Sequence, residues 1–129
     1  MEIILAENHG FCYGVKRAVE MANEAANSDG KSYTLGPIIH NPQVVGRLED
    51  KGVSPVQEVS DIEEGTMIIR SHGVGPAIYE EAEEKGLHIV DATCPYVKKA
   101  QQDAKSVIED GMTLVILGEK NHPEVKSIN

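Results

Sequence analysis

The chain has 129 residues, enough for one ordinary α/β domain or for one domain and part of a second. Its formal net charge of -9 disfavours non-specific binding to nucleic acid. No apolar run approaches the ~18 residues of a membrane span, so we expect neither nucleic acid nor a membrane as a partner. Two cysteines are too few for a disulfide scaffold and no signal peptide is recognisable, so we expect a cytoplasmic setting.

Hydrophobic periodicity predicts strands that alternate with helices. Apolar runs predict strands at 2–6, 32–35, 66–69, 87–90 and 112–117, and a proline-interrupted segment at 53–59 is expected to be an edge strand. Helices are predicted over 15–28 with a stop at Asp29-Gly30, over 42–50, 76–85 and 95–110, and again from Pro123. This alternation is typical of parallel βαβ units, so the predicted fold class is α/β with a parallel sheet.

Cys94 stands between a predicted strand and a helix that opens at Pro95. Proline suits the first helical position, because its missing N–H would have no partner there. The positive end of the helix dipole favours an anion at this place, and hence the thiolate, which binds metals and attacks electrophiles. A small, inert, buried cysteine is the alternative interpretation.

The residues with the most distinctive chemistry all follow predicted strands. These residues are Cys12, His40, His72, Cys94 and, after the last strand, His122 with Glu124. The carboxyl ends of parallel strands share one edge of a sheet, and open α/β folds bind ligands there. The sequence therefore predicts one shared site at that edge.

Several kinds of site are compatible with this residue set. Zinc would accept two thiolates and the imidazoles, although the close ligand pairs of structural zinc sites are absent. A 4Fe-4S cluster takes more cysteines than two, so a further ligand would have to lie beyond Asn129. No G-x-G-x-x-G sequence is present, which disfavours a nicotinamide enzyme.

Five motifs resemble, in order, those of the 4-hydroxy-3-methylbut-2-enyl diphosphate reductase family (LytB/IspH). They are Gly10-Phe-Cys12-Tyr-Gly14-Val-Lys-Arg-Ala, Gly36-Pro-Ile-Ile-His40-Asn, Ser71-His72-Gly-Val, Asp91-Ala-Thr-Cys94-Pro and His122-Pro-Glu124-Val. Members of the family are about twice as long or longer, with three α/β lobes around a central cluster. The resemblance implies a first lobe over 1–95, carrying Cys12, His40, His72 and Cys94, and the beginning of a truncated second lobe over 96–129. One departure is Ser127, where the family usually has glycine.

The resemblance also implies roles for single residues. Cys12 and Cys94 match two of the three cysteines that hold a 4Fe-4S cluster, and the third cysteine is absent from this chain. His40 and His72 match histidines that bind the diphosphate, His122 matches a substrate-pocket histidine, and Glu124 matches the acid that protonates the leaving hydroxyl.

The implied reaction is the reductive removal of the hydroxyl of 4-hydroxy-3-methylbut-2-enyl diphosphate, which gives isopentenyl and dimethylallyl diphosphate in the non-mevalonate isoprenoid pathway. The implied partners are this allylic diphosphate and an electron donor such as ferredoxin or flavodoxin. We expect the 129-residue chain alone to be inactive and to hold a cluster poorly. The alternative function is a non-catalytic zinc module that uses Cys12, Cys94, His40 and His72.

Overall fold

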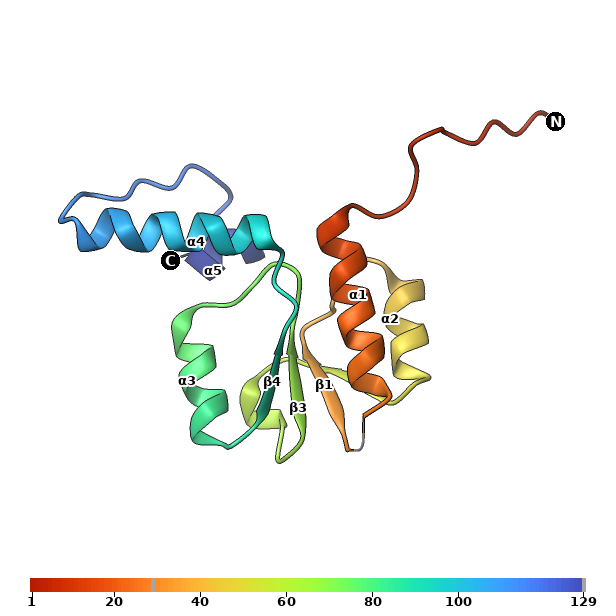
Figure 1. Ribbon diagram of the computed structural model, residues 1–129, viewed down its shortest axis with the longest axis horizontal. Helices are drawn as coiled ribbons and strands as arrows, with labels where there is room; N and C mark the ends of the chain where they lie inside the picture. Colours follow the sequence, from red (N-terminus) through yellow and green to blue (C-terminus); the bar gives the residue numbers. More distant parts are fainter. Residues whose placement is uncertain (29, 129) are drawn as a thin grey trace.

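The computed structural model describes residues 1–28 and 30–128 and contains a parallel sheet with helices on both faces (Figure 1). The strands are β1 (Ser32–Leu35), β2 (Val53–Val56), β3 (Thr66–Ile69) and β4 (His88–Asp91). They pair in the order β2-β1-β3-β4, and every pairing is parallel. The predicted α/β class is confirmed, and the proline-interrupted segment forms an edge strand as expected, although only over 53–56 of the predicted 53–59.

The helices lie between and after these strands. They are α1 (Tyr13–Ala26), α2 (Pro42–Glu49), α3 (Pro76–Glu84), α4 (Pro95–Glu109) and α5 (Pro123–Ile128), with a short 3-10 turn η1 (Val59–Asp61). Proline occupies the first turn of α2, α3 and α4, and the Asn41 side chain caps α2 by accepting a hydrogen bond from the Val44 N–H at 3.1 Å. The predicted stop at Asp29-Gly30 includes Asp29, which lies outside the described residues.

Alternating side chains of β3 divide the core into two layers. Ile68 packs with α1 and α2 on one face of the sheet, whereas Met67 and Ile69 pack with α3 on the other. All three are fully buried. In Figure 1, α1 and α2 accordingly lie on the opposite side of the sheet from α3. The central strand is thus held on both faces, and its carboxyl end is fixed in place.

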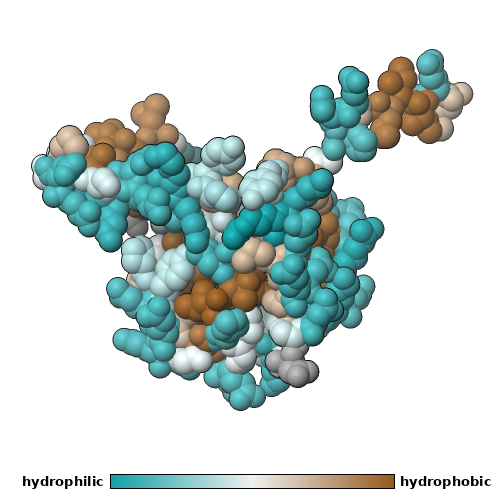
Figure 2. Space-filling view, in the orientation of Figure 1, coloured by the Kyte–Doolittle hydropathy of each residue, from teal (hydrophilic) through white to brown (hydrophobic). Residues whose placement is uncertain are grey.

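Two predicted strands, 2–6 and 112–117, are wrong for the described structure. Both segments are extended chain without strand pairing, and most of their apolar side chains are exposed: Ile3, Ile4 and Leu5 at 72–83%, and Val115 and Leu117 at 80–100%, whereas Leu114 and Ile116 are partly buried. Figure 2 shows the first segment as an apolar arm that leaves the body of the molecule. The apolar, β-branched composition of these segments favours strand, but a strand also needs a neighbouring strand for its backbone hydrogen bonds. No described helix is both long and apolar enough to cross a membrane.

The order of the strands creates a switch point between β1 and β3. The chain passes from β1 outward to β2 through α2, then returns to β3 and continues outward to β4 through α3. The connections that leave β1 and β3 therefore diverge to opposite faces of the sheet. The crevice between them is the place where open α/β sheets bind ligands.

Candidate functional site

Three histidines gather at the switch point. His40 lies on the loop after β1 and His72 on the loop after β3, and their ring centroids are 4.7 Å apart. His122, just before α5, places its ring 6.4 Å from that of His72 in an edge-on orientation. We call these three residues the histidine group. The predicted convergence at the carboxyl edge therefore holds for them, although the segment directly before His122 is not a strand in the described structure.

His72 lies at the centre of this group and is half-buried. Burial lowers the pKa of His72, and the neighbouring His40, Arg70 and His122 lower it further, while Glu124 acts in the opposite direction. The Nδ1 atom of His72 is buried and has no hydrogen-bond partner among the described residues. A cluster of potential cations with an unsatisfied nitrogen is chemically suited to an anion.

Glu124 is half-buried at the start of α5 and close enough to His72 to influence it electrostatically. Its backbone N–H donates to Nδ1 of His122 at 3.3 Å, which ties the first turn of α5 to the histidine group. Glu124 thus brings a carboxyl group to the same edge as the imidazoles.

The two cysteines occupy the N-cap positions of two different helices. Cys12 caps α1 and Cys94 caps α4, and both are free thiols. A Cβ added at Gly14 would lie 2.6 Å from the Cys94 Sγ, so the sulfur rests in the space that this glycine leaves open. Cys12 is two residues from Gly14, which limits their Cα separation to about 7.6 Å. The thiols therefore lie on neighbouring helix ends, although no strand precedes Cys12.

A polar network fixes the loop that carries Cys94. The Asp91 carboxylate accepts hydrogen bonds from the Thr93 N–H at 2.9 Å and the Tyr79 hydroxyl at 3.0 Å, and it pairs with the Lys98 ammonium at 2.6 Å. Burial alone would raise the pKa of Asp91, but the contacts with these three residues outweigh it and lower the pKa. Burial and the Asp91 charge raise the pKa of Tyr79 to about 12. The last residue of β4 is thereby joined to the first turn of α4.

Two further hydrogen bonds connect the Cys94 loop to its neighbours. The Arg17 guanidinium of α1 donates to the Thr93 carbonyl at 3.2 Å, which joins the helix of Cys12 to the loop of Cys94. The Cys94 N–H donates to the Ser71 carbonyl at 2.9 Å, directly beside His72. The thiols of Cys12 and Cys94, which we call the thiol pair, and the histidine group are therefore adjacent at the carboxyl edge of the sheet.

The LytB protein family model matches residues 3–129. The chain belongs to the LytB family. A LytB-family relative from Geotalea uraniireducens (strain Rf4), named 4-hydroxy-3-methylbut-2-enyl diphosphate reductase, is 56% identical over 128 residues. A relative of the same name from Geobacter sulfurreducens (strain ATCC 51573 / DSM 12127 / PCA) is also 56% identical over 128 residues. Each alignment covers 99% of this chain and 45% of the relative, so the chain spans less than half of these curated proteins.

Solved structures agree with this membership of the LytB family. A structure of (E)-4-hydroxy-3-methyl-but-2-enyl diphosphate reductase, described as the terminal enzyme of the non-mevalonate pathway, matches with a TM-score of 0.85 and 52% identity over 98% of this chain and 45% of its own. The E-1-hydroxy-2-methyl-but-2-enyl-4-diphosphate reductase from Plasmodium falciparum matches with a TM-score of 0.90 and 32% identity over 95% and 39%. The fold described above is thus a fold of this family.

The geometry of this LytB-family chain does not favour the zinc module. Within residues 1–28 and 30–128, no three His, Cys, Asp or Glu side chains are grouped to hold a metal ion. Cys12, Cys94, His40 and His72 therefore do not form one compact ligand set.

Sequence reasoning missed two arginines of this LytB-family site. The position of Arg17, one helical turn beyond Gly14 on the helix that Cys12 precedes, could have indicated that its side chain lies near the cysteines. The position of Arg70 could also have indicated a place in the site, because a charged residue directly after the buried strand β3 lies at the carboxyl edge of the sheet.

Proposed function

We propose that the chain is the N-terminal part of a reductase that removes the hydroxyl of 4-hydroxy-3-methylbut-2-enyl diphosphate and gives isopentenyl and dimethylallyl diphosphate. The observation that carries the proposal is the meeting of His40 and His72 at the switch point, beside the loop of Cys94. The names of the relatives support the same reaction, within the shared 45% of their length.

The histidine group would bind the diphosphate. His40, His72 and His122 offer imidazole donors from three separate segments, and the buried Nδ1 of His72 lacks a partner in the described chain. A diphosphate would favour protonation of His72, because its negative charge opposes the effect of the neighbouring cations. Binding of the anion and protonation of the ring are then mutually reinforcing.

The thiol pair would supply two of the ligands of an iron-sulfur cluster. Cysteine thiolates are the ligands of 4Fe-4S clusters, and Cys12 and Cys94 are both free, with Cys94 settled against Gly14 rather than buried in a core. When bound, such a cluster supplies single electrons and a Lewis-acidic iron. The third cysteine ligand belongs to sequence that follows this chain in the proposal.

Glu124 would protonate the departing hydroxyl. The C–O bond breaks with the uptake of two electrons and two protons: one proton converts the hydroxyl to water, and the other is added to an allylic carbon. A carboxyl group near the imidazoles can hold the first of these protons at its oxygen. The structure supports this role through the half-burial of Glu124 and its place beside His72.

The remaining parts of the proposal concern the whole protein. Residues 1–95 would form the first α/β lobe and residues 96–129 the beginning of the second. The electrons would come from a donor such as ferredoxin or flavodoxin in the cytoplasm, and the two free thiols are in keeping with a reducing compartment.

The test is an anaerobic assay of the full-length protein with the allylic diphosphate and a low-potential electron donor. We expect both products, and we expect Glu124→Gln to lower kcat by about 10²-fold or more, as removal of a general acid does. Glu80→Gln, an exposed carboxyl on α3, should leave kcat unchanged. Failure of the full-length protein to form either product contradicts the proposed reaction, and full activity of Glu124→Gln contradicts only the assignment of the acid.

A further inference from the structure

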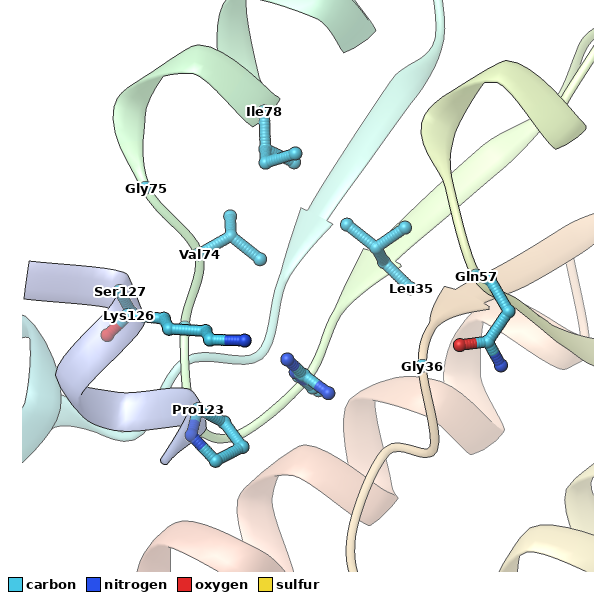
Figure 3. Close-up of a pocket in the computed structure, with 11 residues that line it drawn as sticks. Leu35, Gly36, Gln57, Val74, Gly75, Ile78, Pro123, Lys126 and Ser127 are labelled. Carbon is cyan, nitrogen blue, oxygen red and sulfur yellow. The ribbon is translucent and has the colours of Figure 1, made fainter. Parts of the chain in front are cut away.

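A pocket of about 310 Å³ lies at the switch point (Figure 3), and its lining residues Gly73 and Pro123 directly follow His72 and His122 in the sequence. Its walls come from the carboxyl end of β1 and the loop after it, the segment after β2, the loop between β3 and α3 with the first turn of α3, and α5. We call it the switch-point pocket and define it by Gly36, Gln57, Arg70, Val74 and Lys126. Its volume is at the small end of the range for ligand pockets, which suits a compact ligand.

The charged side chains that line the switch-point pocket are both cations. Arg70 and Lys126 line it, and none of its lining residues is acidic. In Figure 3 the Lys126 side chain reaches from α5 into the pocket, and Gln57 lies across from it. Within the described residues neither cation has a carboxylate at salt-bridge distance, although the chain carries a net charge of -9. Two unpaired cations in one pocket leave a local positive charge that an anion would balance.

Arg70 is half-buried and lies against the loop after β1. A Cβ at Gly36 would lie 2.7 Å from the Arg70 Nη1, so the guanidinium lies directly beside the backbone of the loop after β1. Its Nε is buried and has no hydrogen-bond partner among the described residues. Burial also lowers the pKa of Arg70. Leaving a buried charged donor unpaired costs free energy, and an oxyanion that accepts a hydrogen bond from the guanidinium would recover part of this cost.

We propose that the switch-point pocket binds an oxyanion of the phosphate class through Arg70 and Lys126, at a site additional to the histidine group. The planar guanidinium offers two parallel donors that match phosphate oxygens, and the ammonium of Lys126 supplies a second positive charge from α5. Gly75, the N-cap of α3, also lines the pocket, so the positive end of the helix dipole adds to the positive potential there.

This oxyanion has two possible sources. It is either a free phosphate-class ion or part of a larger diphosphate whose other end reaches the histidine group. The two sites are neighbours, because Arg70 is near enough to His72 to lower its pKa. The inference does not depend on the reductase reaction, since binding of inorganic ions can be measured without substrate turnover.

The test is calorimetric titration of the full-length protein with inorganic phosphate and, separately, with inorganic diphosphate. We expect binding of both, weakened at least tenfold in Arg70→Gln and in Lys126→Gln. Lys126 is exposed on a short helix, so its replacement leaves the fold intact. Lys31→Gln removes the same charge at the opposite end of β1 and should leave both affinities unchanged.

His40→Asn separates the pocket from the histidine group and identifies the source. Phosphate binding that survives in His40→Asn supports the switch-point pocket. A loss of affinity for diphosphate alone in His40→Asn, together with the loss in Lys126→Gln, supports one anion that spans both sites, and no loss for either ion in His40→Asn supports a free ion. The proposal is overturned if the unmodified protein binds neither ion, or if His40→Asn abolishes binding that Lys126→Gln leaves intact.

Discussion

Replacement of Gly14 by alanine tests how closely the two cysteine-bearing helices meet. The added Cβ would lie 2.6 Å from the Cys94 Sγ and 3.2 Å from its Cβ, both shorter than ordinary van der Waals contacts. Gly46 of α2 is the matched control, because it is also helical and a Cβ there meets nothing within 4 Å.

The two substitutions should change stability in opposite directions. Alanine in place of glycine inside a helix stabilises by up to about 1 kcal/mol, and Gly46→Ala should show this gain. Gly14→Ala, in the first turn of α1, has at most the same intrinsic gain, but overpacking of a close contact costs about 1–3 kcal/mol, so we expect a net loss of up to about 3 kcal/mol. Rotation of the Cys94 side chain would relieve part of the cost, but it would move the sulfur.

Two measurements distinguish strain from displacement. Urea unfolding of the reduced 129-residue chain gives the change in free energy for each variant. Iron content of the full-length protein, purified without oxygen, reports whether the sulfur of Cys94 still meets its proposed cluster. If Gly14→Ala matches Gly46→Ala in stability and also keeps the iron content of the unmodified protein, the close packing of Cys94 against α1 is refuted.

Three further predictions concern the loops around the site. Asp91→Ala removes the shared acceptor of the Cys94 loop and should lower the free energy of unfolding by about 1–3 kcal/mol in urea titrations, with Asp103→Ala on the exposed face of α4 as a near-neutral control. The lowered pKa of His72 means that the unfolded chain binds a proton more readily than the folded one, so this contribution to stability is complete above about pH 6.5 and is lost as the pH falls below it. Urea midpoints in His72→Gln should show a weaker fall over that window, and an identical pH dependence would contradict the shift. Asn41→Ala removes the cap of α2 and should cost about 1 kcal/mol in the same titrations, whereas a loss below the experimental error would show that the cap contributes nothing.

The sequence predicts the central fold well because local and tertiary signals agree there. Apolar runs at β1, β3 and β4 are bounded by proline and glycine signals, and the structure shows strands within one residue of the predicted positions. The segments 2–6 and 112–117 carry the same β-branched signal but have no partner strand in the described structure. The composition of a segment indicates its preference for strand, whereas strand pairing depends on whether another segment lies beside it.

The meeting of His40 and His72 was predictable from the sequence, but the close contacts around them were not. Placement of chemistry-bearing residues after parallel strands predicted that His40 and His72 would meet, and their rings are in fact adjacent. Spacing along the chain cannot show that Gly14 makes room for the Cys94 sulfur, or that Gly36 makes room for Arg70, because these pairs are far apart in sequence. Such contacts follow only from the relative placement of whole elements.

The most direct test of the central proposal asks whether Cys12 and Cys94 hold the same cluster. Full-length protein with Cys12→Ser, Cys94→Ser or both would be purified without oxygen and examined for iron content and by paramagnetic resonance after reduction. Because ligands of one cluster act together, we predict that each single variant loses the 4Fe-4S signal and that the double variant loses little more. An unchanged iron content and spectrum in either single variant would contradict the account.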